Sequence, residues 1–330
     1  MSGRRRSGPA GAVVAAVASA AMAAGLFGCS GSEPDRRPPT SPTSPARAGV
    51  SPFTGLPADP APVLAVKIDN VRPARPHTGL DAADIVYVEQ VEAGQSRLLA
   101  VFSSQRPASV GPVRSARESD LELLRQFGRP ALAYSGVQSK LKPLINAAPL
   151  FPLPPEKAPG AYVRDRDRPA PHNLYLRPER ALAAAPDADD SKDIGFRFGA
   201  APAGGTQVNE HTVRFPAARF TFTWSDSDKR WLVAMDGAPA RTTDDGRLGA
   251  PTVVVQKVEV RPSRFQDRGG NVSPYTETVG SGTALVLRDG KSHEARWSRP
   301  AADGGTTFTT PSGQPLNFAP GQVWVVLTAR

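Results

Sequence analysis

The sequence predicts two domains of different class. Residues 51–190 are expected to form an α+β or α/β N-terminal domain with a mixed sheet, and residues 205–330 a smaller, mainly antiparallel β domain. Three observations support this division. Runs of β-branched residues are mixed with helical spacing in the first half, strand patterns dominate the second half, and a polar Ala- and Asp-rich segment follows residue 186.

Four apolar runs predict the strands of the first half. The run that begins at Pro62 contains a single charged residue, Lys67, and ends in Asp69-Asn70, as expected of a strand followed by a turn. The predicted strands cover residues 62–68, 84–89, 97–102 and 131–137.

Helical spacing is clearest over residues 119–127, where Ser119 and Glu122 match a capping box. The segment 149–171 is rich in proline and charge and shows no clear periodicity, so we expect a functional loop or a disordered one. Two further short helices are expected over residues 141–148 and 178–185.

The second half is expected to consist of strands joined by tight turns. Asp289-Gly290 is typical of the turn of a two-residue hairpin. The predicted strands cover residues 220–224, 230–235, 252–260, 283–287, 293–297 and 322–328.

The N-terminal segment resembles a bacterial lipoprotein signal. Three arginines, Arg4 to Arg6, precede an uncharged run that ends at Phe27, and Cys29 follows. This resemblance implies that residues 1–28 are removed and that Cys29 carries the lipid, which would anchor the protein to the outer face of the cell membrane. Residues 29–50 are rich in Pro and Ser and predict an extended tether. An ordinary signal peptide with a stray cysteine and a transmembrane anchor are the alternatives.

The charge balance indicates possible partners. The chain has 40 basic and 31 acidic residues, a formal net charge of +9. Outside the cell the available polyanions are anionic lipid headgroups and phosphate-bearing wall polymers or glycans. No nucleic-acid motif is present, so nucleic acid is not expected as a partner. A basic surface without any partner is the alternative.

Established catalytic and cofactor signatures are absent from the sequence. No G-x-S-x-G elbow, P-loop or G-x-G-x-x-G occurs. Ser139-x-x-Lys142 matches one motif of penicillin-recognising enzymes, but its companion motifs are missing. The four histidines lack metal-binding spacing. We therefore expect no cofactor and no metal.

The segment Gly111–Arg117 is the clearest candidate for a site. A Gly-Pro turn leads into the predicted helix, whose first backbone N–H groups favour an anion. Arg114 and Arg117 lie at this helix start, and arginine presents a planar set of donors to carboxylate or phosphate. Surface salt bridges with the neighbouring carboxylates are the alternative.

Further polar residues are expected near this segment. Glu89 and Glu92 follow a predicted strand and could act as an acid/base pair or as arginine partners. His172 and Asn173 end the Pro-rich loop. We expect that loop to close over the helix start, so that His172 and Arg114 line one cleft.

Several segments form a recognisable set: Ser51–Gly55, Ala74–Leu80, Ala83–Tyr87, Gly111–Arg117, Ala170–Asn173, Val279–Gly282, Asp289–Lys291, Trp297 and Pro320–Trp324. Together they resemble the YerB-like family of bacterial lipoproteins, whose domain is classed as domain of unknown function 3048. The resemblance implies the location and a two-part domain plan, and it provides no reaction, substrate or catalytic residue. It favours a site at Gly111–Arg117 and Pro171–Asn173, whereas Gln90 and Val91 depart from the family pattern beside Glu89 and Glu92. The candidate ligand-binding residues are Arg75, Glu89, Arg114, Ser115, Arg117, His172 and Asn173.

Three functions are compatible with these features. The protein could bind an anionic wall polymer or glycan through its N-terminal domain. It could be an enzyme acting on an envelope polymer, with Glu89 or Glu92 as general base and His172 as acid. It could also be a scaffold for other envelope proteins, with the C-terminal β domain as the docking surface.

Overall fold

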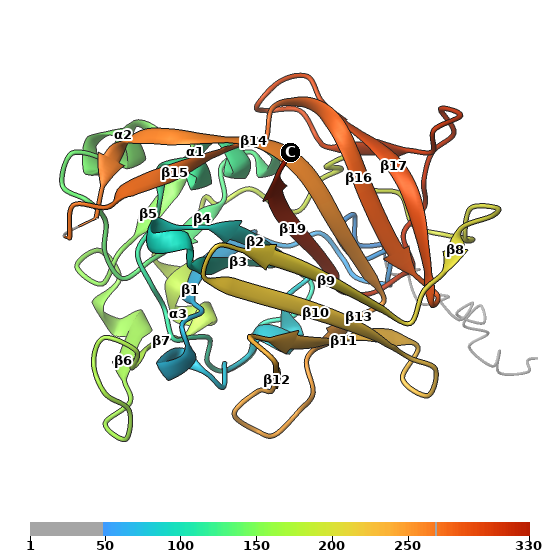
Figure 1. The fold of residues 1–330 in the computed structure, drawn as a ribbon. Coiled ribbons are helices and arrows are strands. Elements are labelled where there is room, and N and C mark those ends of the chain that lie inside the picture. Colours follow the sequence, from blue (N-terminus) through green and yellow to red (C-terminus); the bar gives the residue numbers. More distant parts are fainter. Residues whose placement is uncertain (1–48, 268) are drawn as a thin grey trace, which may run out of the picture. The chain divides into compact units, whose positions relative to one another are not determined.

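The computed structural model describes residues 49–267 and 269–330 (Figure 1). The predicted signal peptide, Cys29 and nearly all of the predicted tether lie outside the described residues. Within the described ranges, no helix is long and apolar enough to cross a membrane.

Strands dominate the described residues, and helices are few and short. The first half contains β1 (Leu64–Asp69), β2 (Ile85–Gln90), β3 (Ser96–Phe102), α1 (Glu118–Leu124), β4 (Ala131–Ala133), α2 (Lys142–Ala147), β5 (Phe151–Leu153), β6 (Tyr162–Arg164), β7 (Leu174–Leu176) and α3 (Pro178–Ala183). The second half contains β8 (Thr206–Gln207), β9 (Glu210–Phe215), β10 (Ala218–Ser225), β11 (Arg230–Met235), β12 (Ala238–Pro239), β13 (Gly249–Ala250), β14 (Thr252–Gln266), β15 (Val272–Glu277), β16 (Gly280–Arg288), β17 (Lys291–Arg299), β18 (Thr307–Thr309) and β19 (Val323–Ala329).

A mixed 12-stranded sheet joins the two halves of the described chain. Its order is β18-β17-β16-β14-β19-β2-β3-β1-β4-β5, with β15 and β8 paired at its side. The last strand, β19, lies between β14 and β2 and is parallel to both. The mixed sheet expected from the sequence is present. The domain division near residues 190–205 stays a prediction, which limited proteolysis can test.

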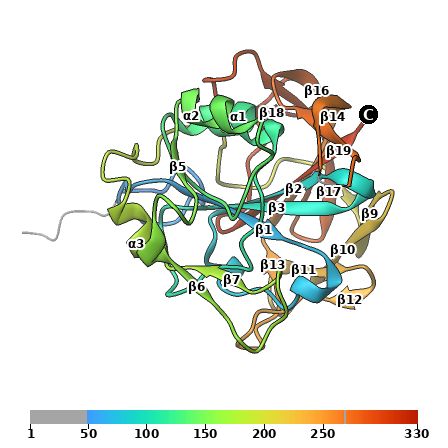
Figure 2. The same ribbon diagram turned by 90° about the vertical axis from the view of Figure 1, so that its left-hand side faces the viewer.

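Each face of this sheet has its own apolar core. On one face a second sheet, of order β12-β11-β10-β9, packs through aromatic side chains. Phe220 and Phe222 contact Trp324 of β19, with ring centroids 6.4 and 6.2 Å apart. On the other face α1 and the following turn bury Leu123, Leu124 and Phe127. Both views show α1 on this side (Figure 2).

Local details differ from the sequence-based expectations. The helix expected from Ser119 begins at Glu118, and its capping carboxylate is Asp120, which accepts the backbone N–H of Arg117 (2.6 Å). The predicted capping box of Ser119 and Glu122 is therefore wrong, because both side chains bind the strand β15 and the residues after it. The segment 149–171 contains the short strands β5 and β6.

Candidate functional site

Four charged side chains lie on one face of three neighbouring strands. The register pairs Asp69 of β1 with Arg97 of β3, and Arg97 with Glu89 of β2. Lys67 lies two residues before Asp69 and therefore on the same face, since side chains alternate along a strand. All four residues are buried. Charges in such a position require partners, because removing an ion from water is costly.

Lys67 lies between two carboxylates, those of Asp120 and Glu89. Its ammonium donates to Asp120 Oδ1 (2.7 Å) and contacts the carboxylate of Glu89. Burial lowers the pKa of Lys67 to about 8, against the opposing effect of Asp120. Asp120 thus binds Lys67 with one oxygen and the start of α1 with the other. Glu89, a predicted ligand-binding residue, is buried against Lys67 and does not line the pocket described next.

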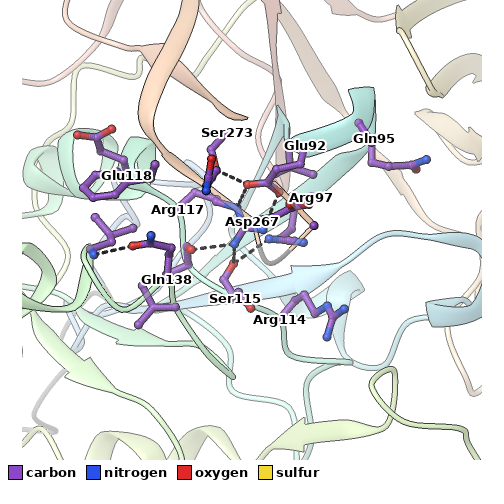
Figure 3. A pocket seen from close by; sticks show the side chains of 18 of the residues that line it. Glu92, Gln95, Arg97, Arg114, Ser115, Arg117, Glu118, Gln138, Asp267 and Ser273 are labelled. Atoms are coloured by element: carbon purple, nitrogen blue, oxygen red, sulfur yellow. Dashed lines mark hydrogen bonds and ion pairs between the residues drawn. The ribbon is translucent and has the colours of Figure 1, made fainter. Parts of the chain in front are cut away.

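A pocket of about 880 Å³ opens beside this charged cluster (Figure 3). The first half provides its charged wall, with Arg97, Arg114 and Arg117. The hairpin of β14 and β15 in the second half provides Phe265, Asp267, Ser273 and their neighbours. The site therefore needs both halves of the chain. We call it the arginine pocket.

Arg117 is held in place by Glu92. Its Nε and Nη2 each donate to one carboxylate oxygen, both at 2.6 Å. Ser273 Oγ, from β15, also donates to Glu92. Burial alone would raise the pKa of Glu92, but the hydrogen bonds and charge of Arg117, helped by Ser273, lower it to about 2. Glu92 is therefore ionised near neutral pH and orients Arg117.

Arg114 and His172 meet on the same oxygen of Asp69. Arg114 Nε lies 3.1 Å from Asp69 Oδ2, and His172 Nδ1 lies 2.8 Å from it. The two residues that were expected to line one cleft therefore share one carboxylate, but only Arg114 lines the arginine pocket, and His172 does not. Asn173 does not line the pocket. Its side chain binds Arg164 and loop carbonyls, so it shapes the loop.

Arg97 is the least satisfied charge in the site. Its Nη1 donates to the carbonyl of Ser115 (3.1 Å), whereas its buried Nε has no hydrogen-bond partner. No carboxylate of the described residues forms an ion pair with it. Burial, reinforced by Arg117, lowers the pKa of Arg97 to about 9, so the group remains a cation near neutral pH. Sequence analysis missed its role, because a charge at the start of a strand is usually solvated.

Arg75, also a predicted site residue, lies elsewhere. Its guanidinium binds Asp236 (2.9 Å) and Asn70 Oδ1 (3.1 Å) and so ties β1 to the second sheet. Ser115 lines the arginine pocket and contributes its backbone carbonyl. In the described part of the chain, no group of His, Cys, Asp and Glu residues is suited to a metal ion.

The arrangement can bind an anion through guanidinium groups. The start of α1 does not provide the site, because the helix has seven residues and Asp120 already lies at its start. Glu92 and Asp69 fix Arg117 and Arg114 as rigid donors. Arg97 adds a cation that forms no ion pair with a carboxylate of the described residues.

Comparisons with known proteins agree with the resemblance found in the sequence. The family model "Protein of unknown function (DUF3048) N-terminal domain" matches residues 53–192, and the model of the DUF3048 C-terminal domain matches residues 211–325. YerB, a candidate lipoprotein of Bacillus subtilis (strain 168), is 25% identical over 288 residues, which cover 83% of this chain and 85% of that protein. The crystal structure of Bacillus subtilis YerB matches with a TM-score of 0.72 at 21% identity, covering 85% of this chain and 97% of that chain. This likeness shows a shared fold.

Proposed function

The chain belongs to the DUF3048 family, and we propose that it is a lipoprotein that binds an anionic ligand of the cell envelope in the arginine pocket. Cys29 would carry the lipid and hold the protein at the outer face of the cell membrane. The N-terminal sequence pattern and the lipoprotein name of the Bacillus relative support this location.

The observation that carries the ligand proposal is that the Arg97 guanidinium donates to the Ser115 carbonyl but forms no ion pair with a carboxylate of the described residues. A buried cation without a counter-ion costs free energy, and its place in the wall of a pocket favours an anion supplied from outside. Carboxylate and phosphate match the geometry of guanidinium donors. Arg114 and Arg117 lie beside Arg97 and would add donors once the ligand enters.

Binding of anionic probes tests this proposal. Inorganic phosphate and soluble poly(glycerol phosphate) would be titrated into the full chain in detergent, and heat release measured. Arg97→Met should weaken binding at least about tenfold, the equivalent of 1.4 kcal/mol. It should leave the unfolding free energy unchanged or raise it, because it removes an unpaired buried charge. Added salt should weaken binding to the wild type.

A matched control removes a charge outside the pocket. Arg166 is exposed, and Arg166→Met should bind both probes as the wild type does. Wild-type affinity in Arg97→Met would contradict the ligand proposal.

The anchor is tested separately. Cys29→Ala should leave the protein unprocessed or release it into the medium, as measured by fractionation and by the mass of the mature chain. Normal processing and membrane retention of this variant would contradict the lipoprotein proposal.

The enzymatic alternative is not proposed. Glu92 forms an ion pair with Arg117, and Glu89 forms one with Lys67, so neither carboxylate is available as a general base.

A further inference from the structure

β9 is an edge strand with one unused side. Glu210–Phe215 pairs with β10 and forms the end of the smaller sheet. Among the described residues, no backbone group pairs with the other side of β9. An open edge of this kind can receive an extended chain as an additional strand.

A groove of about 630 Å³ runs along the open edge. Residues 211–214 of β9 form its wall, and β14, β16, β17 and β19 contribute to its floor. The register explains why the floor residues share one face: Lys257 pairs with Thr328, and Val255 pairs with Leu285, which pairs with Glu294. Arg296 lies two residues after Glu294 and so on the same face. The strands around the groove can be followed in Figure 1.

The groove carries an excess of positive charge. Arg214, Lys257 and Arg296 line it with a single carboxylate, Glu294. None of these four forms an ion pair with another described residue. Burial, reinforced by Lys257, lowers the pKa of His211, which is therefore neutral near neutral pH. Three cations against one anion favour an anionic occupant.

We propose that β9 binds an acidic, extended segment of a partner protein as an added strand, with carboxylates directed at Lys257 and Arg296. β9 has six residues, which span about 20 Å at roughly 3.3 Å per residue. Side chains of the added strand alternate, so every second residue faces the floor. Acidic residues at alternate positions therefore match this groove. A second copy of β9 matches it less well, because pairing would bring the cations of two copies together.

The test uses a designed peptide and the full chain in detergent. The probe is a fluorescent, end-blocked octapeptide of alternating Glu and Val, and fluorescence anisotropy measures its binding. The matched peptide with Lys in place of Glu should not bind. A Glu-Val peptide with N-methylated backbone amides keeps its charge but cannot donate to β9. It should bind at least about tenfold more weakly, a loss of 1.4 kcal/mol.

Charge reversal in the floor provides the second measurement. Lys257→Glu and Arg296→Glu are exposed substitutions, and each should weaken binding of the Glu-Val peptide at least about tenfold. Arg166→Glu makes the same charge change at an exposed site outside the groove and should bind normally. Arg97→Met should also bind normally, which separates this groove from the arginine pocket.

Three results would overturn the proposal. The N-methylated peptide could bind as tightly as its parent, which would mean that charge alone attracts it. Both charge reversals could leave affinity unchanged. The peptide-free protein could dimerise through β9 without competition from the peptide, which would make a second copy the occupant.

Discussion

On one face of β1, β2 and β3, the buried side chains are apolar at one end of the strands and charged at the other. At one end Ala65, Ile85 and Val101 lie in register and share an apolar core with residues of α1. At the other end the charged residues Lys67, Asp69, Glu89 and Arg97 are also buried, and Arg97 borders the arginine pocket. The apolar end is stabilised by burial itself, whereas the charged end is stable only where each ion has a partner. A buried cation without a counter-ion, such as Arg97, therefore indicates that an anion binds there. Buried apolar side chains give no such indication.

Removing a partner from the charged end should have the largest effect. Asp120→Ala leaves Lys67 with fewer acceptors and leaves the N–H of Arg117 without its capping oxygen. We expect a loss of about 3–5 kcal/mol in unfolding free energy, measured by urea denaturation. Asp187→Ala, at an exposed aspartate, is the control and should change stability little. A loss below 1 kcal/mol in Asp120→Ala would contradict a dependence of the charged end on its partners.

A substitution at the apolar end should change stability only through the side-chain volume that it removes from the core. Ile85→Ala removes a fully buried side chain and should cost about 3 kcal/mol, within the usual range for such changes. Phosphate affinity of the folded variant should remain at the wild-type level, as measured by calorimetry. If affinity fell as much as in Arg97→Met, the two ends would not be separable.

Acid should weaken the ion pair between Glu92 and Arg117, which lies beside the charged end. The pKa of Glu92 is lowered from its ordinary value of 4.5 to about 2, so its stabilisation is present above pH 4.5 and is lost as the pH falls toward 2. We expect this contribution to be about 2 kcal/mol, allowing for solvent screening. Glu92→Gln should be less stable than the wild type at pH 6, and the difference should narrow by that amount near pH 2. Urea denaturation across this range measures it, and a constant difference would contradict the assignment.

The smallest loss of stability should result from a substitution in the second half of the chain. Ser273→Ala removes one hydrogen bond to Glu92 and should cost about 1 kcal/mol. It should also raise the pKa of Glu92, which NMR titration of the carboxyl carbon would detect. An unchanged pKa of Glu92 would show that Ser273 of β15 does not stabilise the ionised carboxylate.

The strands of the sheet could be predicted far better than their order. Continuous apolar runs such as residues 62–68 and 252–260 gave β1 and β14 because buried strands need such sequences. That β19 separates β14 from β2 depends on contacts between residues far apart in the chain, which no local pattern records. The short strand β15 lacked an apolar run and was missed.

The candidate site was predicted in part for a similar reason. Arg114, Arg117 and His172 were recognised because unusual local sequences surround them. Asp69 and Arg97 were not, since the partners that reveal them lie on neighbouring strands. The available signal was a charged residue next to continuous apolar runs, which Lys67 also shows. Arg75 was assigned by its motif, and its contact with Asp236 became visible only when the second sheet was placed.

The position of β19 also bears on how the protein is made. A ribosome synthesises Val323–Ala329 after every other described strand, yet this strand fills the gap between β14 and β2 in the sheet. Until these residues emerge, the nascent chain lacks the strand that joins its early and late parts, and pairing across such a long sequence separation is slow. The sheet is therefore completed only after the strands on both sides of β19 have been synthesised.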